Sequence, residues 1–256
     1  MGEFVDLIDK IGKYYKFTPS ELKGFIITIL ILGFIVGFND GRATTNIDWF
    51  WIKNLINSIL IVTFTLLIRE SAHKIAALSV GYRAEYKMWT FGLLIGVVIA
   101  FISGGKVWVL LPAGIILHHM AGHRLGFFRY GLDYFGTGLV SATGPIANML
   151  MAVFLKALMY FNPLNQLLQK AILFNIVFAV YTILPIPPMD GSRMLFGSRM
   201  VYAFIFCSII GGAIFLLIDI PVLLSVLGAL VVGFLGWILY YVFWEKGLWG
   251  GPYPKW

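Results

Sequence analysis

The stretch LLIRESAHK, residues 66–74, places an acid and an imidazole at a spacing that could do chemistry. Glu70 and His73 are three residues apart, and side chains at that spacing lie on the same face of a helix. A carboxylate beside an imidazole is suited to proton transfer or to holding a metal ion. Arg69 is different in kind, because a guanidinium stays protonated and has no lone pair to offer a metal.

A second polar group stands in LPIPPMDG, residues 184–191. Pro185 and Pro188 cannot donate backbone hydrogen bonds, so they end the apolar helix that precedes them. Asp190 and Gly191 then form a turn that fixes a carboxylate at the end of this helix. Taken alone, the aspartate is most simply explained as the cap of the next helix.

A third group, GPIAN at residues 144–148, lies near the start of another apolar run. Gly144 and Pro145 come first, and Asn148 follows one turn later. A buried asparagine needs a hydrogen-bond partner, which we expect on a neighbouring helix. A structural and a functional role fit this pattern equally well.

The elements that must position these residues are apolar. The chain is 60% hydrophobic and 12% charged, and no soluble domain hides so much apolar surface. A spanning helix needs about 20 apolar residues. The apolar runs are 24–38, 50–80, 91–117, 138–161, 166–185, 196–218 and 221–244.

The run 91–117 differs from the others, because SGGK at residues 103–106 divides it into two pieces that are each too short to cross a bilayer. If it forms a re-entrant hairpin, thirteen lysines and arginines fall on one side of the membrane and four on the other. Cytoplasmic loops carry the positive excess. We therefore predict a single domain, residues 1–256, of the all-α integral membrane class. It has six transmembrane helices plus the hairpin, and both termini are cytoplasmic.

The two ends of the chain lie outside the predicted spans. Residues 1–22 mix acids and bases and are predicted to be an interfacial segment that ends in a capping box, Thr18 to Glu21. Residues 245–256 form an aromatic tail. The topology also puts the ends of runs 50–80 and 166–185 on the same side, where Glu70, His73 and Asp190 could meet.

Together, ESAHK, GPIAN and LPIPPMDG resemble the motifs of the site-2 protease family, the intramembrane zinc metalloproteases, over about residues 60–200. The family pairs an H-E-x-x-H helix with a later N-x-x-P-x-x-P-[LM]-D-G segment and often has G-P-x-x-N between them. The resemblance implies that His73 and Asp190 bind zinc and that Glu70 is the general base. It also implies a transmembrane protein segment as substrate, in the lipid bilayer of a prokaryotic cell, with no nucleic acid partner.

Two positions depart from the family pattern. Arg69 replaces the first histidine, and Thr182 replaces an asparagine that the family uses to orient the substrate. The leading hypothesis is a pseudoprotease without zinc, in which Arg69 pairs with Glu70 and Asp190 and the protein still binds membrane helices or a partner.

Two further hypotheses are kept. In the first, the chain is an active zinc protease whose missing ligand comes from His118, His119 or His123, of which His119 and His123 have helical i, i+4 spacing. The second is a transporter or channel, for which the outer halves of the spans carry few ionisable residues.

Overall fold

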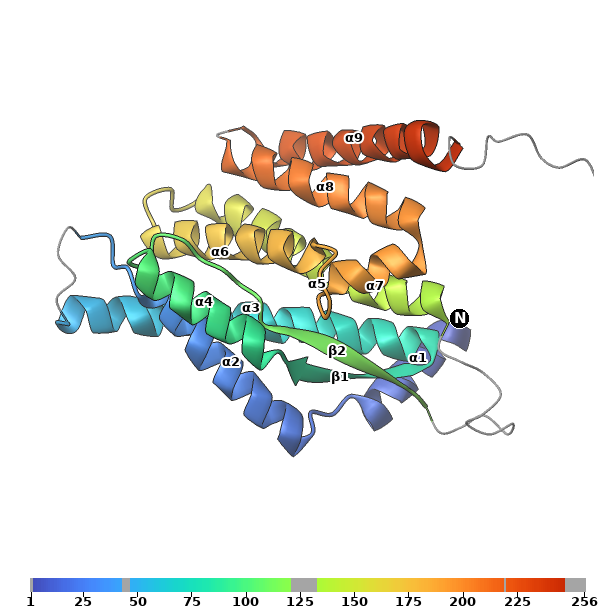
Figure 1. Cartoon of the computed structure of the whole chain (residues 1–256), viewed down its shortest axis with the longest axis horizontal. Coiled ribbons are helices and arrows are strands. Elements are labelled where there is room, and N and C mark those ends of the chain that lie inside the picture. Colours follow the sequence, from blue (N-terminus) through green and yellow to red (C-terminus); the bar gives the residue numbers. More distant parts are fainter. Residues whose placement is uncertain (1, 43–46, 121–132, 219, 247–256) are drawn as a thin grey trace, which may run out of the picture.

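The computed structural model describes residues 2–42, 47–120, 133–218 and 220–246. Helices dominate, and they pack side by side in a bundle with a small two-stranded sheet on one face (Figure 1). The helices are α1 (Gly2–Tyr14), α2 (Pro19–Gly37), α3 (Trp49–Val80), α4 (Thr90–Ile102), α5 (Tyr134–Met159), α6 (Gln166–Ile183), α7 (Asp190–Gly197), α8 (Arg199–Leu217) and α9 (Val222–Tyr240), which continues as a π-helical turn (Tyr241–Glu245).

Six of these helices are long and apolar enough to cross a membrane, counted over the described residues. They are α2, α3, α5, α6, α8 and α9, and they coincide with the six predicted spans to within a few residues. The prediction of six such helices is therefore confirmed. The capping box at the start of α2 is also present, because the Thr18 and Glu21 side chains each accept from the other's backbone.

The all-α prediction missed two strands, β1 (Tyr82–Met88) and β2 (Ala113–His119), which pair in antiparallel register. In β1 the side chains of Tyr82, Ala84 and Tyr86 are buried, and those between them are more exposed. This two-residue period is the mark of a half-buried strand. It was overlooked because the segment is short and adjoins a much longer apolar run.

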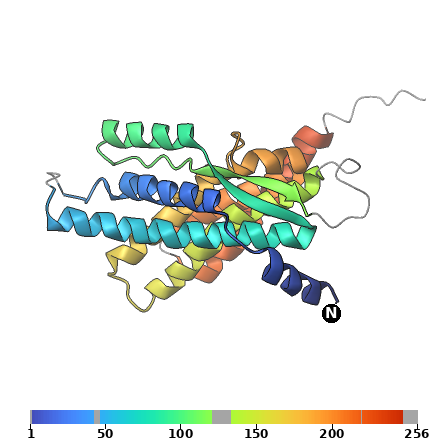
Figure 2. The ribbon, with the colours of Figure 1, turned by 90° about the horizontal axis from the view of Figure 1, so that it is seen from below.

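The predicted hairpin region, 91–117, leaves and returns at the same end of the molecule. Its first limb is α4, and its second is an extended segment that leads into β2 (Figure 2). Gly104 and Gly105 turn the chain with φ of 61° and 72°. The backbone N–H of Trp89 donates to the carbonyl of Pro112 at 2.9 Å and closes the base. The two limbs therefore form a helix and an extended strand rather than two helical halves.

A buried ion pair ties the N-terminal segment to this region. Lys74 Nζ on α3 donates to Glu21 Oε1 at 2.8 Å and to the carbonyls of Lys16 and Ala84, each at 3.1 Å. The N–H of Tyr86 donates to the same Glu21 oxygen at 2.8 Å. One ammonium and one carboxylate thus join the residues before α2, the middle of α3 and strand β1.

The hydroxyl of Tyr86 completes this contact. It donates to Thr28 Oγ1 at 2.7 Å, and both residues are buried. Burial raises the pKa of the Tyr86 hydroxyl well above its usual range, so the hydroxyl keeps the proton that it donates.

Helices α8 and α9 form an antiparallel layer along one edge of the bundle (Figure 1). Glycines let the two helices approach closely, since a Cβ at Gly228 would lie 2.7 Å from the ring of Phe215 and one at Gly236 would lie 2.3 Å from Cys207 Sγ. Only Ser225 and Gly233 of α9 are buried. Most of this helix is therefore free to face lipid.

Replacing Lys74 with methionine should leave the Glu21 carboxylate buried without its cation. Breaking a buried pair in this way costs about 3–5 kcal/mol. We expect a lower unfolding midpoint in detergent and faster proteolysis before residue 18. The matched control is Lys23→Met on the exposed side of α2, for which neither quantity should change. Equal stability of the two variants would contradict the role given to the pair.

Candidate functional site

Three helices, α3, α5 and α7, bring the motif residues together. α3, 32 residues long, carries Arg69, Glu70 and His73, and α7 begins at Asp190. α5 passes between them at Gly144, where a Cβ would lie 2.3 Å from His73 Nε2 and 3.1 Å from Asp190 Oδ2. No side chain fits at this position. The glycine of GPIAN is thus explained by the approach of α5 to the site.

The proline segment turns the chain so that Asp190 faces α3. Leu184 ends α6 in an extended conformation, and Met189 precedes α7 without a side-chain cap. A Cβ at Gly191 would lie 1.9 Å from the carbonyl oxygen of Ile183, so the start of α7 packs directly on the end of α6. The Asp190 carboxylate bonds to Arg69. The simplest expectation, that Asp190 caps the next helix, was wrong.

A guanidinium bridges two carboxylates at the centre of the site. Arg69 Nη1 donates to Glu70 Oε1 at 2.5 Å, and Nη2 donates to Asp190 Oδ2. The imidazole of His73 lies beside both acids, with Nδ1 at 3.4 Å from Glu70 Oε2 and Nε2 at 3.7 Å from Asp190 Oδ2. The Phe178 ring lies 5.4 Å from the Arg69 carbon Cζ. We call Arg69, Glu70, His73 and Asp190 the arginine cluster.

The arginine cluster is closed. Its four side chains are at most 2% exposed. Several polar atoms in and near it are buried without a hydrogen-bond partner among the described residues, namely Arg69 Nε, His73 Nε2, Asp190 Oδ1 and the Oγ of Ser141. Such unsatisfied groups are uncommon and costly, and they concentrate where a site has a function other than stability.

Asn148 does not make the helix-to-helix bond that we expected. Both its amide nitrogen and its amide oxygen are buried without a partner in the described part of the chain. Asn148 lies one turn after Gly144 on α5, so its unpaired amide belongs to the part of α5 that follows the contact with the arginine cluster.

Thr182 is buried on α6, and its hydroxyl bonds to its own helix. It donates to the carbonyls of Phe178 at 2.9 Å and Ala179 at 3.2 Å. A hydroxyl used in this way does not reach across the site as the longer asparagine arm of the family would.

The histidines proposed as replacement ligands lie elsewhere or outside the described residues. His118 and His119 are on β2, where His118 Nε2 is 3.5 Å from Glu85 Oε2 and the His119 ring packs on Tyr82 at 5.1 Å. β2 meets the proline segment at Gly114, whose Cβ would lie 2.5 Å from the carbonyl oxygen of Pro188. His118 and His119 lie four and five residues beyond Gly114 on β2. At about 3.3 Å per residue of strand, this places them about 13 and 17 Å from Gly114 along the strand. His123 falls in 121–132, outside the described residues.

These residues do not fit a catalytic zinc ion. Such a site uses three protein ligands and one open position. His73 and Asp190 could supply two, but the place of the first family histidine is taken by a cation that already binds Asp190. Among the described residues no group of three or more His, Cys, Asp or Glu side chains is arranged to hold a metal.

The chain resembles a protein of Methanocaldococcus jannaschii named "Putative zinc metalloprotease MJ0611". The two are 23% identical over 210 residues, which cover 79% of this chain and 97% of the relative. No protein-family model matches the chain, and no solved structure matches it. The similarity extends over nearly the whole length of the relative.

Replacing Arg69 with methionine should destabilise the protein by about 3–5 kcal/mol, because two buried carboxylates lose their shared cation. Neutralising those acids as well, by Glu70→Gln and Asp190→Asn, should restore much of the loss. Chemical unfolding in detergent measures both. A triple variant that is no more stable than Arg69→Met would show that the acids do not depend on the arginine.

Proposed function

We propose that this chain is a site-2-protease-like membrane protein in which an arginine stands in place of the metal, and that it binds transmembrane helices without cutting them. The observation that carries the proposal is the bridge from the Arg69 guanidinium to Glu70 and Asp190. It involves the two acids that the resemblance makes general base and zinc ligand.

The chemistry of the bridge opposes hydrolysis in two ways. The carboxylate of Glu70 accepts from Arg69, so a lone pair that a general base would use is already engaged. The fixed positive charge beside Asp190 also repels a divalent cation. Similarity to a protein named as a putative zinc metalloprotease supports a common origin with such proteins. Arg69 supports the loss of proteolytic activity in this chain.

An active enzyme is the second candidate. Its support is the 3.7 Å approach of His73 Nε2 to Asp190 Oδ2, together with a polar atom on each side chain that has no partner in the described part of the chain. This candidate requires the Arg69 side chain to leave and one of His118, His119 or His123 to approach.

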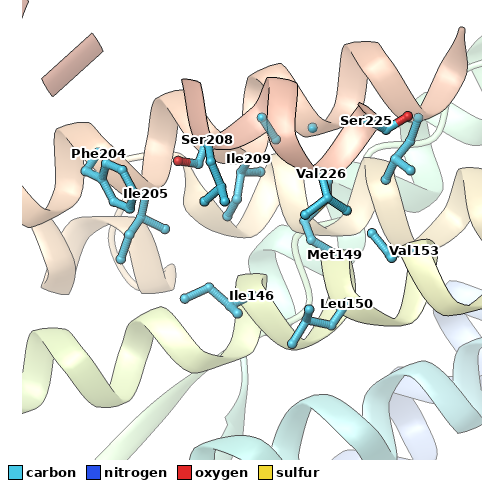
Figure 3. A pocket seen from close by; sticks show the side chains of 14 residues that line it. Ile146, Met149, Leu150, Val153, Phe204, Ile205, Ser208, Ile209, Ser225 and Val226 are labelled. Carbon is cyan, nitrogen blue, oxygen red and sulfur yellow. The ribbon is translucent and has the colours of Figure 1, made fainter. Parts of the chain in front are cut away.

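A groove on the side of the bundle suits the proposed client helix. It lies between α5, α8 and α9, has a volume of about 240 Å³ and is lined almost entirely by apolar side chains (Figure 3). Its polar members are Ser225, which donates its hydroxyl to the Phe215 carbonyl at 3.1 Å, and Ser208, whose hydroxyl has no partner among the described residues. Helices in a bilayer associate through close van der Waals packing. Apolar side chains of one transmembrane client helix would pack here.

The arrangement in the membrane follows from the charges. We propose a multi-pass protein of a prokaryotic cell membrane, with both termini cytoplasmic and 91–117 re-entrant. The support is the excess of lysine and arginine at the end of the bundle where the arginine cluster lies. The return of the chain at Trp89 and Pro112 is compatible with re-entry.

Cysteine labelling tests this orientation. Cys207 is the chain's one cysteine, so Cys207→Ser gives a background for Lys13→Cys on α1 and Asn162→Cys after α5. A membrane-impermeant maleimide should label residue 162 in intact cells and residue 13 only after permeabilisation, because the two residues lie on opposite sides. The reverse pattern would invert the proposed topology.

Metal analysis of the purified protein tests the pseudoprotease. We expect little zinc in the natural protein and near-stoichiometric zinc in Arg69→His, because the histidine restores a third ligand. Arg69→Gln is the matched control, since it removes the charge without adding an imidazole, and it should not gain zinc. Near-stoichiometric zinc in the natural protein, lost on His73→Ala, would refute the proposal and favour the active enzyme.

A further inference from the structure

A second polar site lies at the other end of the bundle, where α3 and α6 begin. It is a cavity of about 880 Å³, walled by the α2–α3 connection, the starts of both helices and Trp108 on the extended limb. Sixteen residues of α3 separate its wall residue Asn54 from Glu70, or about 24 Å of helix. The cavity is therefore independent of the arginine cluster.

Two lysines give the cavity its charge. Lys170 Nζ donates to Asn54 Oδ1 at 2.7 Å and to Ser58 Oγ at 2.8 Å, and both acceptors are neutral. An ammonium has three N–H donors, so one stays available. Lys53 is the other cation of the wall. Within the described ranges, neither lysine is within ion-pair distance of a carboxylate.

The one acidic side chain of the wall is already paired. Asp40 Oδ2 accepts from Arg42 Nε at 2.8 Å and from Nη2 at 2.5 Å. Arg42 also pairs with Asp48, through Nη1 at 2.6 Å, so these three side chains together carry one negative charge. With Lys53 and Lys170 in the wall, one positive charge remains in excess.

Neutral donors also line the cavity. The side chains of Asn57 and Gln166 belong to its wall, and amide groups donate two N–H bonds each. α6 starts here with Asn165 as its N-cap, accepting from the N–H groups of Leu167 and Leu168. A helix start carries partial positive charge, which adds to that of the lysines.

We propose that this cavity binds the phosphate of an anionic phospholipid headgroup. It lies at the ends of helices that are long and apolar enough to span a membrane, at the depth of the lipid phosphates, and its excess positive charge attracts an anionic headgroup. Its apolar wall includes Phe50, Trp108 and Leu173. Aromatic side chains favour this depth of the bilayer, and these three would contact the glycerol and the first acyl carbons.

Thermal unfolding of the full chain in neutral detergent tests the site. Short-chain phosphatidylglycerol should raise the midpoint in a saturable way, and short-chain phosphatidylcholine should not. Lys53→Met and Lys170→Met should each weaken the response about fivefold. Lys106→Met, an exposed lysine outside the cavity wall, is the matched control and should bind as the natural protein does.

Two further comparisons distinguish a lipid headgroup from free phosphate as the ligand and keep the test valid if one variant does not fold. Inorganic phosphate that reproduces the whole gain would identify a free anion as the ligand of the same site, whereas a gain confined to phosphatidylglycerol identifies the headgroup. Lys170→Arg keeps the charge and should retain binding. Lys53→Met leaves the bonds of Lys170 to Asn54 and Ser58 intact, so it reports on binding even if Lys170→Met does not fold. Equal responses to both lipids, or unchanged binding by Lys53→Met, would overturn the proposal.

Discussion

The guanidinium of Arg69, held between two buried carboxylates, is the interaction on which the centre of the molecule depends. Charges taken out of water are costly, and their attraction compensates only when the geometry is good and the remaining donors are used. The bridge from α3 to Asp190 fixes the start of α7 against α3. The close approach of α5 at Gly144 and of α7 at Gly191 then follows, because larger residues would hold the charges apart.

Much of the fold was predictable because a membrane-spanning helix shows in the sequence as one continuous run of apolar residues. Six runs of apolar residues predict six helices, since only a helix satisfies its own backbone in an apolar medium. The strands β1 and β2 depend instead on a partner far along the chain, as in the pair Tyr82 and His119, which are 37 residues apart. An alternation over only seven residues is too short to predict a strand from the sequence alone. For this reason the predicted class was all-α.

The sequence predicted which site residues lie close together, but it predicted their hydrogen-bond partners less well. The topology placed Glu70, His73 and Asp190 at one end of the bundle, and the structure has them within hydrogen-bonding or ion-pair reach of one another or of Arg69. The amide of Asn148 was expected to find a partner, and none is present among the described residues. Side-chain partners depend on rotations and offsets between helices, which hydropathy does not encode.

The order of the cluster residues along the chain shapes how it can be assembled. Arg69 and Glu70 are adjacent, so α3 brings its own counter-charge when it enters the bilayer. Asp190 follows 121 residues after the arginine, or roughly 6–24 seconds later at ordinary rates of synthesis. During that interval the arginine already has one acid beside it. When α7 is synthesised, Asp190 therefore adds a second carboxylate to an arginine that Glu70 already neutralises.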